Sequence, residues 1–184
     1  PAALVLTAIY WRNTWKYQAR GYRHLFWDSG TMLANLLATA SGLSLDARLV
    51  TGFVDSRVNR LLGLDPEKEG SLELAVVSDS DPTSPGDRAI VAVSPGAIVE
   101  PIAPRSLPLS SREVDYPLLR EMHAASSLED AGEVSQWRSG QEIRRLDPPS
   151  DLLSLPPPRR RAGPGLGETI IRRASTREFA RVSI

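Results

Sequence analysis

The chain has 184 residues, with 22 basic and 22 acidic side chains and a formal net charge of zero. Zero net charge gives no support for nonspecific nucleic-acid binding, which needs a cationic surface, so we expect no nucleic-acid partner. The absence of cysteine excludes disulfides and thiolate ligands, and the two histidines, His24 and His123, lie too far apart to indicate a local metal site. No apolar run reaches about 18 residues, so we expect no membrane span and a cytoplasmic location.

The first 77 residues hold all the long apolar runs, and two hydrophobic periodicities alternate along them. Short apolar runs rich in β-branched residues predict strands, whereas apolar residues every three or four positions predict a helix. In chain order we predict a buried strand over 3–11, a polar and aromatic segment over 13–21, a helix over 22–41 ended by Gly42, a strand over 47–53, a short helix capped by Asp55 and stopped by Gly63, and a strand over 71–77.

The remainder of the chain carries most of the 15 prolines and few aromatic residues, so we expect a core smaller than the length suggests. Here we predict a turn-forming stretch over 78–87, a further strand over 89–93, an extended linker over 95–108, a helix over 114–125 with His123 on its surface, a disordered or extended Pro/Arg-rich stretch over 148–165, and a helical turn over 167–173.

Arg173, Ser175 and Arg177 place two cations and a hydroxyl at alternate positions next to a predicted helix end. Such groups can surround a phosphate with charge-assisted hydrogen bonds. A solvated, arginine-rich segment is the alternative interpretation.

Thr51 and Gly52 lie at the end of a predicted strand. A glycine at this position allows the backbone to lie against a flat ring. An ordinary turn between a strand and a helix is the alternative.

Lys16 and Tyr17 are adjacent, and Lys16 is one of only two lysines in a chain whose other basic residues are arginines. An amine and a phenol can transfer protons when a pocket alters their acidity. The alternative is an ordinary surface pair, and for His24, at the start of the long helix, we expect a structural role.

The block from Gly30 to Val77 resembles the latter half of a nitroreductase domain, in which a long helix, a strand, a Gly-Phe turn, a short helix and a final strand follow in this order. The run 173–179, Arg-x-Ser-x-Arg-x-Phe, resembles the motif near the start of such a domain. This resemblance implies an α+β, nitroreductase-like fold that binds FMN. It implies that the turn residues contact the flavin ring and that the phosphate and ribityl chain are held by Arg173, Ser175 and Arg177.

A strand followed by Lys-Tyr, Arg-x-Tyr-Arg and a helix bearing Asp-x-Gly resembles the SagB-type branch of that superfamily. Its members use FMN to oxidise azoline rings in peptides to azoles. The resemblance implies that Lys16 and Tyr17 are catalytic.

The order of these motifs, a domain end before a domain start, resembles a piece of a protein with two tandem flavin domains. It implies the back half of a first domain over 1–93, a Pro-rich linker with a short helix over 94–165, and the start of a second domain over 166–184. The implied partners are a peptide or small-molecule substrate and either the rest of the tandem protein or a second subunit in a dimer.

Two other functions stay open. Complete nitroreductases place a lysine or arginine after the last strand, whereas residues 78–81 are acidic, so the first domain could be a non-catalytic scaffold or dimerisation module. The third possibility is a reductase of nitro compounds or quinones that uses NAD(P)H.

Overall fold

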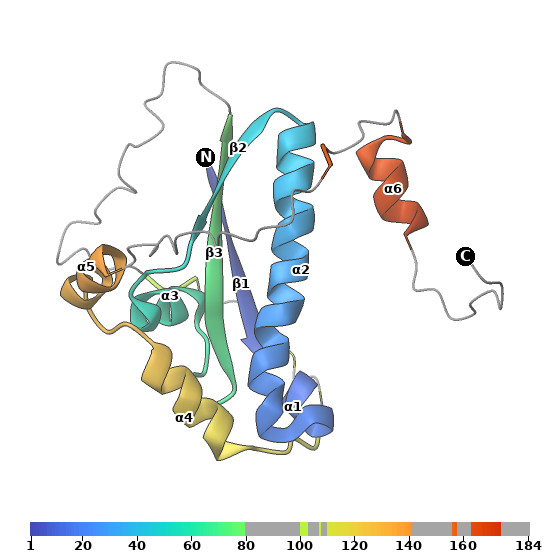
Figure 1. Cartoon of the computed structure of the whole chain (residues 1–184). Coiled ribbons are helices and arrows are strands. Elements are labelled where there is room, and N and C mark those ends of the chain that lie inside the picture. The colour runs from blue at the N-terminus through green and yellow to red at the C-terminus, as the bar shows by residue number, and fades with distance from the viewer. Residues whose placement is uncertain (80–99, 103–106, 108–109, 141–155, 158–162, 174–184) are drawn as a thin grey trace, which may run out of the picture. The chain divides into compact units, whose positions relative to one another are not determined.

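A computed structural model describes residues 1–79, 100–102, 107, 110–140, 156–157 and 163–173. The chain divides into two compact units, 1–143 and 144–184, and each is described by itself. The first unit is an α+β assembly of a small sheet and several helices (Figure 1). Its elements are β1 (Ala2–Ile9), α1 (Trp11–Tyr17), the 3₁₀ helix η1 (Gln18–Arg20), α2 (Gly21–Gly42), β2 (Leu45–Val50), α3 (Asp55–Leu62), β3 (Glu69–Asp79), α4 (Pro117–Ser126) and α5 (Ala131–Ser139), and the second unit contains α6 (Leu166–Arg172).

The sheet has the order β1-β3-β2, and both outer strands run antiparallel to β3. The outer strands are therefore parallel to each other and run toward the same end of the sheet (Figure 1). The last residue of β1, Ile9, pairs with Glu69, whereas the last residue of β2, Val50, pairs with Leu74. Val5 of β1 also pairs with Leu74, so β1 extends beyond the end of β2 by the four residues after Val5, about 13 Å at the usual rise of a strand.

β3 contains a β-bulge at Leu72, because Leu6 pairs with Glu73 while the next residue, Thr7, pairs with Ser71. The extra residue breaks the alternation of side chains between the two faces of the sheet. Ser71 points toward α3, where Asn59 Oδ1 accepts hydrogen bonds from its backbone N–H at 3.0 Å and its hydroxyl at 2.9 Å. Glu73 instead points toward α2.

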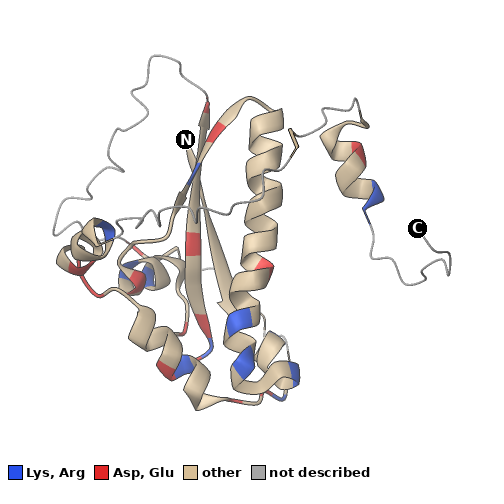
Figure 2. Cartoon of the chain, viewed as in Figure 1, with Lys and Arg blue, Asp and Glu red and all other residues tan. Residues whose placement is uncertain are grey.

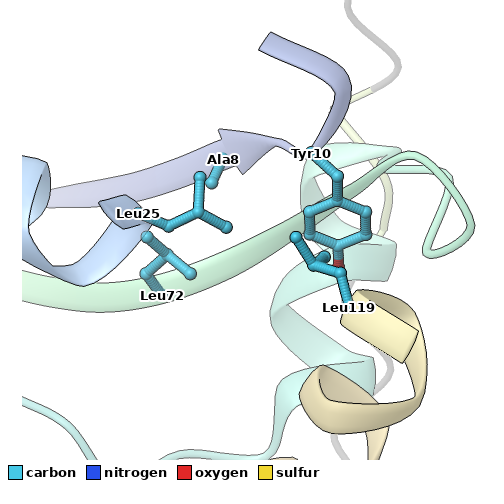
Figure 3. Close-up of a cluster of buried hydrophobic side chains, with 5 residues drawn as sticks. All are labelled: Ala8, Tyr10, Leu25, Leu72 and Leu119. Atoms are coloured by element: carbon cyan, nitrogen blue, oxygen red, sulfur yellow. The ribbon is translucent and has the colours of Figure 1, made fainter. Parts of the chain in front are cut away.

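The hydrophobic core joins the sheet to α2 and α4 (Figure 3). Leu119 of α4 is 1% exposed, so α4 is an integral part of the first unit although it lies in the stretch predicted as a linker. Burial of such side chains is the main favourable contribution to folding. The cluster consists of Ala8, Tyr10, Leu25, Leu72 and Leu119.

The helix predicted over 22–41 and the strands predicted around 3–11, 47–53 and 71–77 are confirmed within one to three residues at most ends. Trp11 begins α1 instead of ending the first strand, so that boundary was wrong. Asp55 is the first residue of α3 and not its cap, since Val54 precedes the helix without a capping side chain. Gly63 ends α3 with a left-handed φ of 67°, as a glycine at this position can without a steric cost.

Three further differences concern the helices. α1 and η1 occupy the segment for which only polar and aromatic character was noted, and α5 was not predicted. α4 starts at Pro117 rather than at 114, because proline fits the first turn of a helix, where its missing N–H is not needed. The strand predicted over 89–93 lies outside the described residues, as does most of the stretch 148–165.

No helix in the described part of the chain is both long and apolar enough to cross a bilayer. Within the same residues, no group of three His, Asp or Glu side chains is arranged to hold a metal ion.

Candidate functional site

Lys16 and Tyr17 form the last turn of α1, immediately before an abrupt change of direction in the backbone. Gln18 has φ 52° and ψ −142°, a region that side-chain-bearing residues rarely adopt. Its N–H bonds the carbonyl of Thr14, and the buried Thr14 hydroxyl donates to the carbonyl of Tyr10 at 3.0 Å. The predicted catalytic pair is therefore held on a strained turn that is anchored to the core.

The Tyr17 ring stacks on the His24 ring of α2, with centroids 3.8 Å apart and planes 12° from parallel. His24 Nδ1 lies 3.1 Å from the carbonyl oxygen of Arg20, so Nδ1 carries a proton and donates it. The other side of the histidine approaches Trp27, whose ring centroid is 4.9 Å away. His24 thus lies directly against the ring of the predicted catalytic residue Tyr17.

Figure 2 shows Lys and Arg residues along α1 and the first turns of α2. The exposed aromatic residues Trp15, Phe26 and Trp27 lie on the same two helices. Lys16 Nζ lies 5.3 Å from the centroid of the Tyr17 ring, and the guanidinium of Arg23 lies 5.9 Å from the Trp27 ring. Both distances are within the range of cation–π attraction. Lys16 is exposed and Tyr17 is half-buried, so an amine and a phenol are presented together to a molecule arriving from solvent.

The predicted ring-binding turn is already filled by another part of the chain. Thr51 is exposed, but Gly52 is buried against α5. A Cβ atom added to Gly52 would lie 2.8 Å from Cε3 of the Trp137 indole, and Arg138 Nη2 donates to the Gly52 carbonyl at 2.7 Å. Glycine does let the backbone lie against a flat ring here, but that ring is an indole of this chain.

The start of α5 is tied to the start of α3 by a reciprocal pair of hydrogen bonds. The Asp55 N–H donates to the Leu128 carbonyl at 3.0 Å, and the Leu128 N–H donates to Asp55 Oδ2 at 2.8 Å. Burial raises the pKa of Asp55, although the Leu128 N–H opposes that rise. Asp130 then caps α5, accepting from the N–H groups of Gly132 at 2.7 Å and Glu133 at 2.9 Å.

A second polar cluster lies under α4. His123 is 9% exposed, so its predicted surface position was wrong, and both of its ring nitrogens lack a hydrogen-bond partner among the described residues. Its ring packs edge-on against those of Tyr10 and Tyr22, and Tyr22 exchanges a hydrogen bond of 2.7 Å with Ser126. Burial lowers the pKa of His123 and raises that of Tyr10. These shifts favour the neutral forms, which suits a packed interior.

The predicted site residues do not form a single cluster in the described structure. The Lys16–Tyr17 pair follows β1 and the Thr51–Gly52 turn follows β2, two strands that run in the same direction, but no hydrogen bond or ring contact joins them in the part of the chain that is described. Arg173 follows α6 in the second unit, while Ser175 and Arg177 lie outside the described residues. An FMN ring does not fit at Gly52 as it stands, because Trp137 occupies the open side of this glycine.

Sequence reasoning missed the contacts of Trp137 and Arg138 with Gly52, and it gave His24 a structural role without its contact to Tyr17. A local signal for α5 exists, since Asp130 is followed three residues later by Glu133, the spacing of a helix start. Nothing local could show that α5 docks on Gly52, because 86 residues separate Arg138 from the carbonyl it binds.

Comparison with known proteins finds a family match in the first part of the chain. Residues 1–77 match the nitroreductase family. The microcin B17-processing protein McbC of Escherichia coli is 35% identical over 63 residues, which cover 34% of this chain and 23% of that protein. The chain therefore spans about a quarter of the length of this relative.

Two solved structures are also similar. One, from Anabaena variabilis and described as a nitroreductase, has a TM-score of 0.52 and 29% identity, covering 70% of this chain and 25% of that one. The other is the E. coli microcin synthetase McbBCD complex with truncated pro-MccB17 bound, with a TM-score of 0.41 and 30% identity over 43% of this chain and 30% of that one.

Proposed function

We propose, taking residues 1–77 as part of a nitroreductase-family domain, that the protein is an FMN-dependent oxidoreductase that oxidises azoline rings in a peptide to azoles. The observation that supports this substrate class is the Lys16–Tyr17 pair, which is presented to solvent at the end of α1. The similarity of this chain to the microcin B17-processing protein McbC over 63 residues also supports it. A peptide substrate, and either further domains of the same protein or a second subunit, are the partners we propose.

In this reaction the side chains of this chain handle the proton. The Lys16 amine or the Tyr17 phenol would remove a proton from the azoline ring, and His24 would keep the phenol in place through the stacked contact of 3.8 Å. Cations on α1 and α2 would attract the electron-rich parts of a peptide to this surface (Figure 2). The phosphate of FMN is assigned to Arg173, Ser175 and Arg177. No step of the reaction is placed at the Thr51–Gly52 turn, because the turn is filled.

A non-catalytic scaffold is the second candidate, and a specific observation favours it. The indole of Trp137 fills the place where an FMN ring would be expected, and Asp79 ends β3 where a phosphate-binding cation is found in the family. In this alternative the first unit would hold a peptide or another subunit, and oxidation would take place in another domain.

The visible absorption spectrum of the purified full-length protein separates these candidates. A bound flavin, together with conversion of an azoline peptide to its azole detected by a mass loss of two hydrogens, is the result expected of the oxidoreductase. Purified protein that carries no flavin, takes none up from solution and leaves the azoline unchanged would refute the enzymatic proposal.

A further inference from the structure

We propose that α5 covers the Thr51–Gly52 turn and competes for this place with the flat ring of a flavin. The inference rests on the proposed function only for the identity of the competing ring. Its basis is that the chain supplies its own aromatic ring and its own hydrogen-bond donor at the place where the sequence predicts contact with a cofactor.

The contact is close enough to exclude a second ring. Trp137 Cε3 and Cζ3 lie 2.8 and 2.9 Å from the position of a Cβ on Gly52, so the indole fills the space that the missing side chain leaves. The Gly52 carbonyl is taken by Arg138. A flat ring that approached the same side of Gly52 would have to displace both side chains.

The contact of α5 with the rest of the first unit is also small, so a bound ring could replace it. Among its nine residues only Val134 is buried, and Trp137 remains 38% exposed. A segment with few buried apolar contacts opens locally at a small cost in free energy. The hydrogen bonds between Asp55 and Leu128 hold the residues just before α5, so displacement of α5 from Gly52 would not detach it from the first unit.

The first experiment removes the indole. We expect Trp137→Ala in the full-length protein to bind FMN about tenfold more tightly than the wild type, because a site that is mostly covered loses apparent affinity in proportion to its covered fraction. Quenching of FMN fluorescence measures the binding. Gln136→Ala is the matched control, since this neighbouring side chain is exposed on the same helix and makes no hydrogen bond within the described structure, and it should leave the affinity unchanged.

Unchanged affinity in Trp137→Ala would overturn the competition and leave the proposed function standing. Weaker affinity would also overturn it, since Trp137 would then be part of the flavin site. If neither protein binds FMN, both the competition and the proposed function fail.

The second experiment needs no variant, so it holds even if Trp137→Ala does not fold. Amide hydrogen exchange is followed in the wild-type protein with and without saturating FMN. We expect residues 131–139 to exchange faster when FMN is bound, because α5 is then displaced. Unchanged or slower exchange in this helix, with FMN bound, would refute the proposal.

Discussion

The Ser29 hydroxyl of α2 donates a hydrogen bond of 3.0 Å to Glu73 Oε1 of β3, inside the contact between the long helix and the sheet. The second carboxylate oxygen, Oε2, is buried without a partner among the described residues, and the side chain of Glu73 is 9% exposed overall. Burial raises the pKa of Glu73, and the hydrogen bond from Ser29 only partly offsets this rise. Protonation of the Glu73 carboxylate is therefore coupled to folding.

We expect the free energy of unfolding to fall with rising pH because of Glu73, and Glu73→Gln to remove this dependence. The folded state holds the proton more tightly than the unfolded chain, so the stabilisation is fully present below the unfolded pKa and is lost as the pH rises through the folded pKa. Urea unfolding between about pH 4 and 8 measures the effect. An identical pH slope in wild type and variant would show that Glu73 does not carry it.

Ser29→Ala is the companion variant, because it removes the donor and leaves Glu73 in place. We expect it to lower the free energy of unfolding by about 1–3 kcal/mol at neutral pH. Combining the two changes in a double-mutant cycle gives the coupling between the side chains.

Two glycines offer a matched test of packing. A Cβ on Gly70 would collide with the His123 ring and the Tyr10 hydroxyl, whereas nothing lies within 4 Å of a Cβ on Gly30, in the middle of α2. We expect Gly70→Ala to destabilise the protein by about 1–3 kcal/mol. Gly30→Ala should stabilise it by about 0.5–1 kcal/mol, because alanine favours the helix. Thermal unfolding that shifts in the same direction for both variants would contradict the packing described here.

Gln18→Gly tests the strained turn beside the candidate catalytic pair. Glycine accepts the observed φ of 52° and ψ of −142° without strain, so we expect a gain of up to about 1 kcal/mol in the free energy of unfolding. The same change in an ordinary helix, Gln136→Gly in α5, should instead cost about 1 kcal/mol. A loss of stability in Gln18→Gly would mean that this turn is not strained.

Lys16→Ala and Tyr17→Phe in the full-length protein should each lower azoline oxidation about 10²- to 10⁴-fold while bound FMN is retained, because proton transfer loses its positioned group. Arg173→Ala or Arg177→Ala should instead weaken FMN binding, since each removes a cation from the phosphate. Product formation and flavin content, measured on the same preparations, separate the two effects. Wild-type turnover in both Lys16 and Tyr17 variants would place the chemistry outside the first unit.

His24 provides the control for the aromatic stack. We expect His24→Phe to keep a ring against Tyr17 and to preserve more turnover than His24→Ala, which removes the contact of 3.8 Å. Equal turnover in the two variants would mean that the stack does not orient Tyr17.

The elements that could be predicted from sequence are those whose pattern is local. The apolar spacing within α2 and the apolar run of β3 indicate which face of each element is buried. α1 has no comparable pattern. Its buried residue is Thr14, a polar side chain whose hydroxyl donates a hydrogen bond to the carbonyl of Tyr10. Helix formation there depends on tertiary packing, which sequence periodicity does not reveal.

In the candidate site, too, features that are local in the sequence could be predicted and contacts between distant residues could not. Lys16 and Tyr17 could be selected because they are adjacent in the chain. The stack of Tyr17 on His24 could not, because the seven-residue spacing brings the rings together only after the break at Gln18. The contact of Trp137 and Arg138 with Gly52 could not be predicted either, because Arg138 lies 86 residues further along the chain.

The bulge at Leu72 divides β3 into two segments whose side chains are out of phase. Up to Ser71 one set of alternate residues meets α3, and from Glu73 onward the equivalent set meets α2. The bulge takes up Leu72, so the residues after it pair with β1 as if Leu72 were absent, and Glu73 lies on the face opposite Ser71. If Leu72 instead took a place of its own in a regular ladder, every later side chain would change faces, and the Glu73 carboxylate would lie on the same side as Ser71. Comparison of β3 with strands of other proteins therefore requires a one-residue gap at Leu72, without which buried and exposed positions would be equated.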